Sequence, residues 1–125
     1  ADAVFNIGRT ALMVASFALN RPEYLGMATE DRLHQQARRG VFHEMKVIFD
    51  SALAAGARGV FLSGAGSCVI AFTTRVENRA FTLGYEMANA ADKSGLQGTF
   101  RILDPSSTGA KVIDGIPVDV IAEVK

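Results

Sequence analysis

The first apolar stretch of the chain follows a helical pattern in which apolar residues occupy almost every position. Over residues 3–19 they leave only a narrow polar stripe, whose members recur at spacings of three, four and multiples of these. The residues of this stripe are Asp2, Asn6, Arg9, Ser16 and Asn20. A helix with so little polar surface is predicted to be buried on most sides, and we assign it a packing role.

Two more helices are predicted before the first strand. Asn20 is placed to cap the second helix, with Pro22 in its first turn, and this helix is expected to end near Gln36. The third covers residues 41–55 and is closed by Gly56. The side chains expected to face the core are Tyr24, Leu25, Ala28 and Leu33 in the second helix and Phe42, Met45, Phe49, Ala52 and Leu53 in the third.

A glycine-rich break, Leu62-Ser63-Gly64-Ala65-Gly66-Ser67-Cys68, separates two apolar runs. The run before it, residues 58–62, and the run after it, through Phe72, predict a strand, a turn and a strand. The break can turn the chain tightly, with glycine supplying positive φ, or let its backbone N–H groups converge on an anion. The local pattern favours the hairpin turn, because no Gly-Lys-Ser/Thr follows and the next element is a strand.

The clearest helix start in the chain is Thr74-Arg75-Val76-Glu77, which has the pattern of a capping box. The helix that it predicts runs down to Ser94-Gly95. One face of this helix carries residues expected to pack inward, namely Val76, Ala80, Leu83, Gly84, Met87 and Ala91.

Strand signals dominate the end of the chain. Residues 98–103 predict one strand, and Asp114-Gly115 predicts a hairpin between residues 111–113 and 116–122, with Pro117 confining the last strand to an edge. The predicted order of elements is three helices, two strands, a helix and two to four strands. This order predicts an α+β fold, with an antiparallel sheet packed against helices on one face.

Composition narrows the possible functions. Thirteen basic residues balance thirteen acidic ones without a basic stripe, so nucleic acid is not expected as a ligand. No apolar run approaches the roughly 20 residues that cross a membrane, so no membrane association is expected. The single cysteine, Cys68, suits a reducing cytoplasm. The only imidazoles, His34 and His43, are not spaced to share a helix face, and no metal site is expected.

Three stretches together carry a family resemblance. They are residues 2–12, the run Glu30-Asp31-Arg32-Leu33-His34-Gln35 continuing to Arg38, and residues 62–66. As a set they resemble the C-terminal half of the homoserine kinases, in the family shared with galactokinase, mevalonate kinase and phosphomevalonate kinase. The resemblance implies a ferredoxin-like C-terminal domain over residues 1–125. The N-terminal ATP-binding domain is expected to be absent, because the chain contains no Gly-Leu-Gly-Ser-Ser stretch and opens inside a helical pattern without Met.

The resemblance implies transfer of the γ-phosphoryl group of ATP to the hydroxyl of L-homoserine, with Mg²⁺, on the route to threonine. Arg38 would bind the substrate carboxylate. Five loop residues would pack beside the phosphate loop of the other domain and hold its shape, and they are Ser63, Gly64, Ala65, Gly66 and Ser67. No catalytic residue or metal ligand is expected in this chain, which alone is expected to be inactive and to hold no cofactor.

The chain also departs from the family pattern. Ser67-Cys68 stands where the family usually has Pro-Thr, and Gln36-Ala37 stands where it usually has a proline and an aromatic residue. These departures affect the geometry expected for the loop and the acceptor pocket.

Two alternatives stay open. One is a non-catalytic α+β ligand-sensing or oligomerisation module, in which the glycine loop is only a turn and Arg38 and Arg39 are cations at a helix end. The other is a kinase for another small alcohol in the same family, against which the run at residues 30–35 argues. If a strand of the domain is missing from the chain, an exposed sheet edge would also favour a homo-oligomer.

Overall fold

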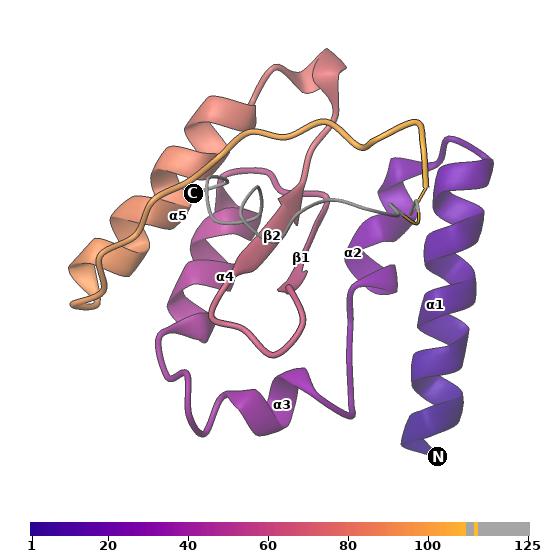
Figure 1. Cartoon of the computed structure of the whole chain (residues 1–125), viewed down its shortest axis with the longest axis horizontal. Helices are drawn as coiled ribbons and strands as arrows, with labels where there is room; N and C mark the ends of the chain where they lie inside the picture. The colour runs from indigo at the N-terminus through magenta and orange to yellow at the C-terminus, as the bar shows by residue number, and fades with distance from the viewer. Residues whose placement is uncertain (110–111, 113–125) are drawn as a thin grey trace.

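The computed structural model describes residues 1–109 and 112 (Figure 1). In chain order its elements are α1 (Asp2–Ala18), the 3-10 turn η1 (Pro22–Tyr24), α2 (Leu25–Ala28), α3 (Gln35–Arg38), α4 (Met45–Ala54), β1 (Gly59–Leu62), β2 (Val69–Phe72), the 3-10 turn η2 (Arg75–Glu77) and α5 (Ala80–Lys93). The hairpin predicted around Asp114-Gly115, together with Pro117, lies outside the described residues.

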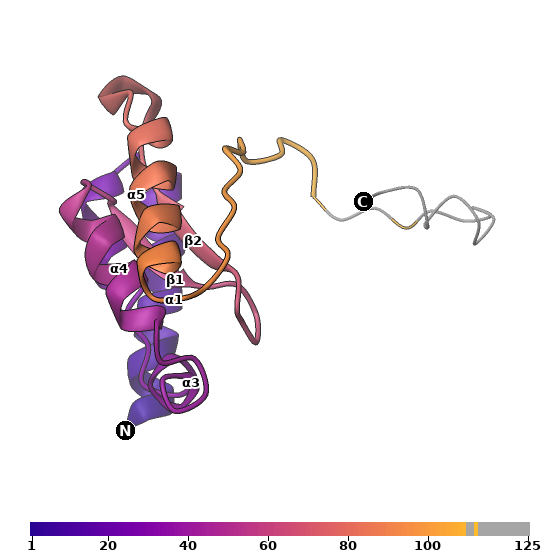
Figure 2. The same cartoon turned by 90° about the vertical axis from the view of Figure 1, so that its left-hand side faces the viewer.

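The centre of the fold is an antiparallel hairpin covered by two helices. Gly59 of β1 pairs with Phe72 of β2, and Leu62 pairs with Val69. Helices α4 and α5 lie together on one side of this hairpin (Figures 1 and 2). The buried apolar residues between them are Ile48, Ala52, Val60, Leu83, Ala90 and Ala91. The predicted strand, turn and strand are confirmed, and so is the α+β class with helices on one face of an antiparallel sheet.

Helix α4 begins at Met45, four residues later than predicted, and ends as predicted before Gly56. Gly56 has φ +94°, and the N–H of Ala57 beyond it donates to the carbonyl of Ala52 at 2.9 Å. Met45 and Ala52 are fully buried, as expected, whereas Leu53 is half exposed. The left-handed glycine therefore fixes the turn from α4 into β1.

The expectation that the first helix is buried on most sides is wrong. In α1 only Ser16 is buried, and Val4, Ile7 and Val14 are each more than 60% exposed. The side of the helix that faces the domain carries polar and apolar contacts, because Asn6 binds Asp31 and the ring of Phe17 packs on Phe72 of β2. The apolar pattern correctly predicted a helix, but it could not show which side of the helix the rest of the domain covers.

The second predicted helix is divided in three. Asn20 has φ +51° and caps nothing, and Arg21 precedes η1 instead. α2 ends at Ala28, where the hydroxyl of Thr29 donates to the carbonyl of Leu25 at 2.9 Å. Leu25 and Ala28 are buried as expected, whereas Leu33 is 56% exposed. Side-chain hydrogen bonds to the backbone compete with helix continuation here.

The capping box is present but starts only a short turn. The N–H of Thr74 donates to Glu77 at 3.2 Å, and the 3-10 turn η2 ends at Asn78, whose φ is +48°. α5 therefore starts at Ala80, and Val76 is exposed rather than packed inward. Leu83 and Ala91 of α5 are buried as predicted.

The strand predicted over residues 98–103 is not formed. The segment has no strand partner among the described residues, and it runs along α5 instead. The ring of Phe100 contacts Phe81 at 5.6 Å between centroids. Side-chain packing on α5 therefore replaces the strand pairing that the sequence predicted.

Candidate functional site

The glycine-rich loop, residues 63–68, closes the hairpin tightly. The N–H of Ser63 donates to the carbonyl of Cys68 at 2.9 Å, and the N–H of Gly66 donates to the carbonyl of Ser63 at 3.1 Å. Gly64 and Gly66 have φ of +56° and +85°, values that residues other than glycine rarely adopt. Two N–H groups of the loop are thus used within the turn, and fewer remain to meet an anion.

The segment before α3 is hydrogen-bonded to this loop. The Nε2 atom of His34 lies 3.0 Å from the carbonyl oxygen of Gly64. Gln35 links two elements, because its Oε1 accepts from the N–H of Leu62 at 2.9 Å and its Nε2 donates to the carbonyl of Thr29 at 3.0 Å. Figure 1 shows α3 beside the loop between β1 and β2. The run at residues 30–35 therefore holds the base and the tip of the glycine loop.

The carboxylate of Asp31 organises this segment. It accepts hydrogen bonds from the backbone N–H groups of Leu33, His34 and Gln35, and from the side-chain amide of Asn6 in α1. Partial burial acts to raise the pKa of Asp31, but the hydrogen bonds from Asn6 and from the three N–H groups outweigh it and lower the pKa to about 2. The ionised carboxylate is thus favoured at neutral pH, and it accepts the N–H of Gln35, the first residue of α3.

Arg38 stands one turn beyond Gln35, in the last turn of α3. Its side chain is partly buried, and its Nε atom is buried without a hydrogen-bond partner among the described residues. No hydrogen bond joins Arg38 to residues 63–68 in the described part of the chain. α3 has only four residues, so its dipole is small and stabilises the positive charge of Arg38 only weakly. The guanidinium has capacity left for a planar anion such as a carboxylate.

Arg39, next in sequence, occupies a different environment. It lines a cavity of about 490 Å³ that Arg38 does not line. Phe49 of α4, Val60 of β1 and Gln36 also line this cavity. The two neighbouring arginines therefore serve as a matched pair for testing the role predicted for Arg38.

The structure links the segment at residues 30–35 to α1 and to the base and tip of the glycine loop through residues to which no site role was assigned from the sequence. The residues that make these connections are Asn6, Asp31, His34 and Gln35. A signal for Asp31 was present, since an aspartate favours turns and helix starts over helix interiors. No local signal points to Asn6, because it lies 25 residues before Asp31.

Two negative findings apply to the described residues. They contain no group of three His, Cys, Asp or Glu side chains that could hold a metal ion. None of the helices in residues 1–109 is long and apolar enough to span a membrane.

Comparison with known proteins gives matches over most of the chain. Residues 13–92 match the family model described as GHMP kinases C terminal. The chain is 39% identical to "Homoserine kinase" of Caldicellulosiruptor bescii, over 89% of this chain and 36% of that protein. It is also 39% identical to "Homoserine kinase" of Moorella thermoacetica, over 90% of this chain and 37% of the relative. The chain is 38% identical to "Homoserine kinase" of Caldanaerobacter subterraneus subsp. tengcongensis, over 90% of this chain and 35% of that protein.

The chain thus spans little more than a third of the length of these relatives. No solved structure matches it significantly.

Proposed function

The chain belongs to the GHMP kinases, and on that premise we propose that it is the C-terminal domain of a homoserine kinase. The observation that carries the proposal is that relatives matching 89–90% of the chain bear that name. In the complete enzyme the reaction would transfer the γ-phosphoryl group of ATP to the hydroxyl oxygen of L-homoserine, with loss of the hydroxyl proton. The soluble enzyme would work in the cytoplasm, where the free thiol of Cys68 is stable.

Arg38 is the residue of this chain to which we assign the substrate. Its side chain is only partly buried and makes no ion pair with a carboxylate in the described part of the chain, so its terminal nitrogens are free for two-pronged binding of a carboxylate. Holding the carboxylate at α3 would orient the hydroxyl at the other end of the substrate. Such positioning contributes much of the rate of phosphoryl transfer, because the transferred group needs an aligned acceptor.

Five residues of the glycine-rich loop would support the phosphate loop of the other domain rather than replace it. They are Ser63, Gly64, Ala65, Gly66 and Ser67. Their turn uses the N–H groups of Ser63 and Gly66 internally, and it leads into β2 instead of a helix N-terminus. Bound MgATP supplies the phosphoryl group and the positive charge that offsets its developing negative charge. We assign Mg²⁺ to the N-terminal domain of the complete enzyme, as the family resemblance implies.

The role of Arg38 is tested in the complete polypeptide by steady-state kinetics. Arg38→Ala should raise the KM for L-homoserine by roughly tenfold to more than a hundredfold, the equivalent of a charged hydrogen bond of about 1.5–3 kcal/mol. The KM for ATP should stay nearly constant, because the carboxylate lies away from the nucleotide. Arg39→Ala is the matched control and should change both constants little.

The competing account makes Arg38 and Arg39 equivalent cations at a helix end. It predicts that both substitutions cost a few tenths of a kcal/mol in stability and leave the kinetics unchanged. Unaltered homoserine kinetics for Arg38→Ala would therefore remove Arg38 from the substrate site.

A further inference from the structure

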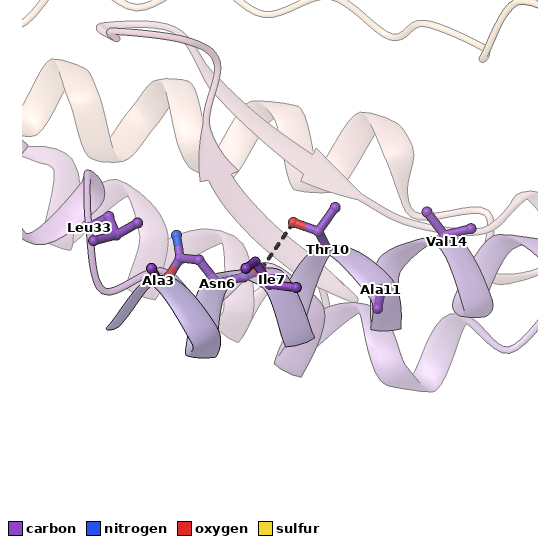
Figure 3. A pocket seen from close by; sticks show the side chains of 7 residues that line it. All are labelled: Ala3, Asn6, Ile7, Thr10, Ala11, Val14 and Leu33. Carbon is purple, nitrogen blue, oxygen red and sulfur yellow. Dashed lines mark hydrogen bonds between the residues drawn. The ribbon is translucent and has the colours of Figure 1, made fainter. Parts of the chain in front are cut away.

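An open apolar groove of about 500 Å³ runs along α1. Ala3, Ile7, Ala11 and Val14 line it from the helix, and Leu33 closes it at the Ala3 end (Figure 3). The side chains of Ile7, Val14 and Leu33 are 67%, 64% and 56% exposed. Such a continuous apolar surface on one helix is costly in water and marks a place where another surface packs.

The groove is exposed because α1 contacts the domain through its opposite side. Its polar residues face the domain, where Arg9 pairs with Glu30 at 3.0 Å and Ser16 donates to the carbonyl of Arg21 at 2.6 Å. Rotating the helix to bury the groove would break these contacts together with the Asn6 bond to Asp31. The orientation of α1 is therefore fixed by polar contacts and by the ring of Phe17, which packs on Phe72 of β2 at 5.6 Å between centroids. Only the apolar face that lines the groove is left to a partner.

The chemistry of the groove excludes a polar metabolite as its occupant. The hydroxyl of Thr10 donates to the carbonyl of Asn6 at 3.0 Å, within the helix (Figure 3). The amide of Asn6 donates to Asp31 and accepts from the N–H of Arg32 at 3.0 Å. The groove therefore offers mainly methyl groups. Its lining positions 3, 7, 11 and 14 are spaced by four and three residues, which is the spacing of a seam between packed helices.

We infer that the groove of α1 is covered by the part of the same polypeptide that precedes Ala1. The inference rests on the proposed function, because the chain matches a C-terminal family model and about two thirds of each relative lies outside the match. Ala3, at one end of the groove, is two residues from Ala1, so a preceding segment is tethered beside its own binding surface. Tethering gives that segment a high effective concentration compared with a free competitor.

Thiol accessibility in the complete polypeptide tests this inference. In a Cys68→Ser background, which removes the exposed native thiol, Ile7→Cys places a reporter in the groove. Val76→Cys is the matched control, because Val76 is 96% exposed and lies on η2. The thiol introduced by Ile7→Cys should react with a maleimide at least about tenfold more slowly than in the same polypeptide unfolded in urea. The thiol introduced by Val76→Cys should react within about twofold of its unfolded rate.

Equal rates for Ile7→Cys in the folded and urea-unfolded polypeptide would overturn the inference. Protection that disappears on dilution would also overturn it, because it would make a second copy of the chain the occupant. Phosphorylation of L-homoserine, measured on the same preparation before the substitutions, separates the two proposals. A protected groove in a polypeptide without that activity would refute the proposed function alone, and an open groove in an active kinase would refute the inference alone.

Discussion

Replacing Asp31 by asparagine should remove the anion that starts α3 while preserving the size of the side chain. The carboxylate accepts three backbone N–H groups and the amide of Asn6, and an asparagine in its place has only one acceptor oxygen. Its amide nitrogen would face N–H groups that need an acceptor. Asp31→Asn should therefore destabilise the segment that holds His34 and Gln35 against the glycine loop.

The size of the effect follows from the pKa of Asp31, which falls from 3.8 to about 2 in the folded chain. At about 1.4 kcal/mol for each factor of ten in proton affinity, this corresponds to about 2–3 kcal/mol. Solvent screening at a partly exposed carboxylate reduces the expected stabilisation to about 1–2 kcal/mol. Because the folded pKa is the lower one, this stabilisation is complete above about pH 5 and is lost as the pH falls toward about 2.

Urea unfolding of the 125-residue chain between pH 7 and pH 2 measures this contribution. Asp31→Asn should lower the free energy of unfolding by about 1–2 kcal/mol at pH 7, and the difference from the unsubstituted chain should shrink toward about pH 2. Asp50→Asn is the control, because Asp50 pairs with Lys46 on the exposed side of α4, and it should cost no more than about 0.5 kcal/mol. A pH-independent difference for Asp31→Asn, or none at all, would refute the reasoning.

Two further predictions concern packing and nucleotide binding. Gly59→Ala should lower the free energy of unfolding by about 1–3 kcal/mol, because its methyl group would lie 2.7 Å from the carbonyl oxygen of Leu25. Gly8→Ala, in α1 with no atom within 4 Å, should instead raise it by up to about 1 kcal/mol, and urea unfolding of both variants checks the contrast. Calorimetric titration of the 125-residue chain with MgATP should show no saturable heat at millimolar nucleotide, since a single glycine turn offers few donors to a triphosphate, and a micromolar Kd would contradict this.

The hairpin and the helices that cover it could be predicted because their signals are local. The apolar runs on both sides of the glycine-rich break specify two strands, and Gly56 specifies the end of α4. By contrast, the division of the second predicted helix depends on the hydrogen bond that Thr29 donates to a backbone carbonyl and on those that Asp31 accepts from backbone N–H groups. Helical periodicity does not report such competition, and the contribution of Asn6 comes from a distant element.

The orientation of α1 could not be predicted for a different reason. An apolar helix is expected to bury most of its surface in its own domain, whereas here the ion pair of Arg9 with Glu30 and the packing of Phe17 on Phe72 attach it by the opposite side. The segment over residues 98–103 does not form the expected strand, because a strand needs a neighbouring strand to pair with. Phe100 of this segment packs on Phe81 of α5 instead. The role assigned to Arg38 stays a prediction.

The most direct test of the central claim is the phosphorylation of L-homoserine by the complete polypeptide that contains this chain. With MgATP and L-homoserine, ³¹P NMR should show a new phosphomonoester resonance that grows in step with ADP. L-2-aminobutyrate, which lacks the acceptor hydroxyl, should give neither. Formation of no phosphomonoester from L-homoserine, while another small alcohol is phosphorylated, would contradict the account.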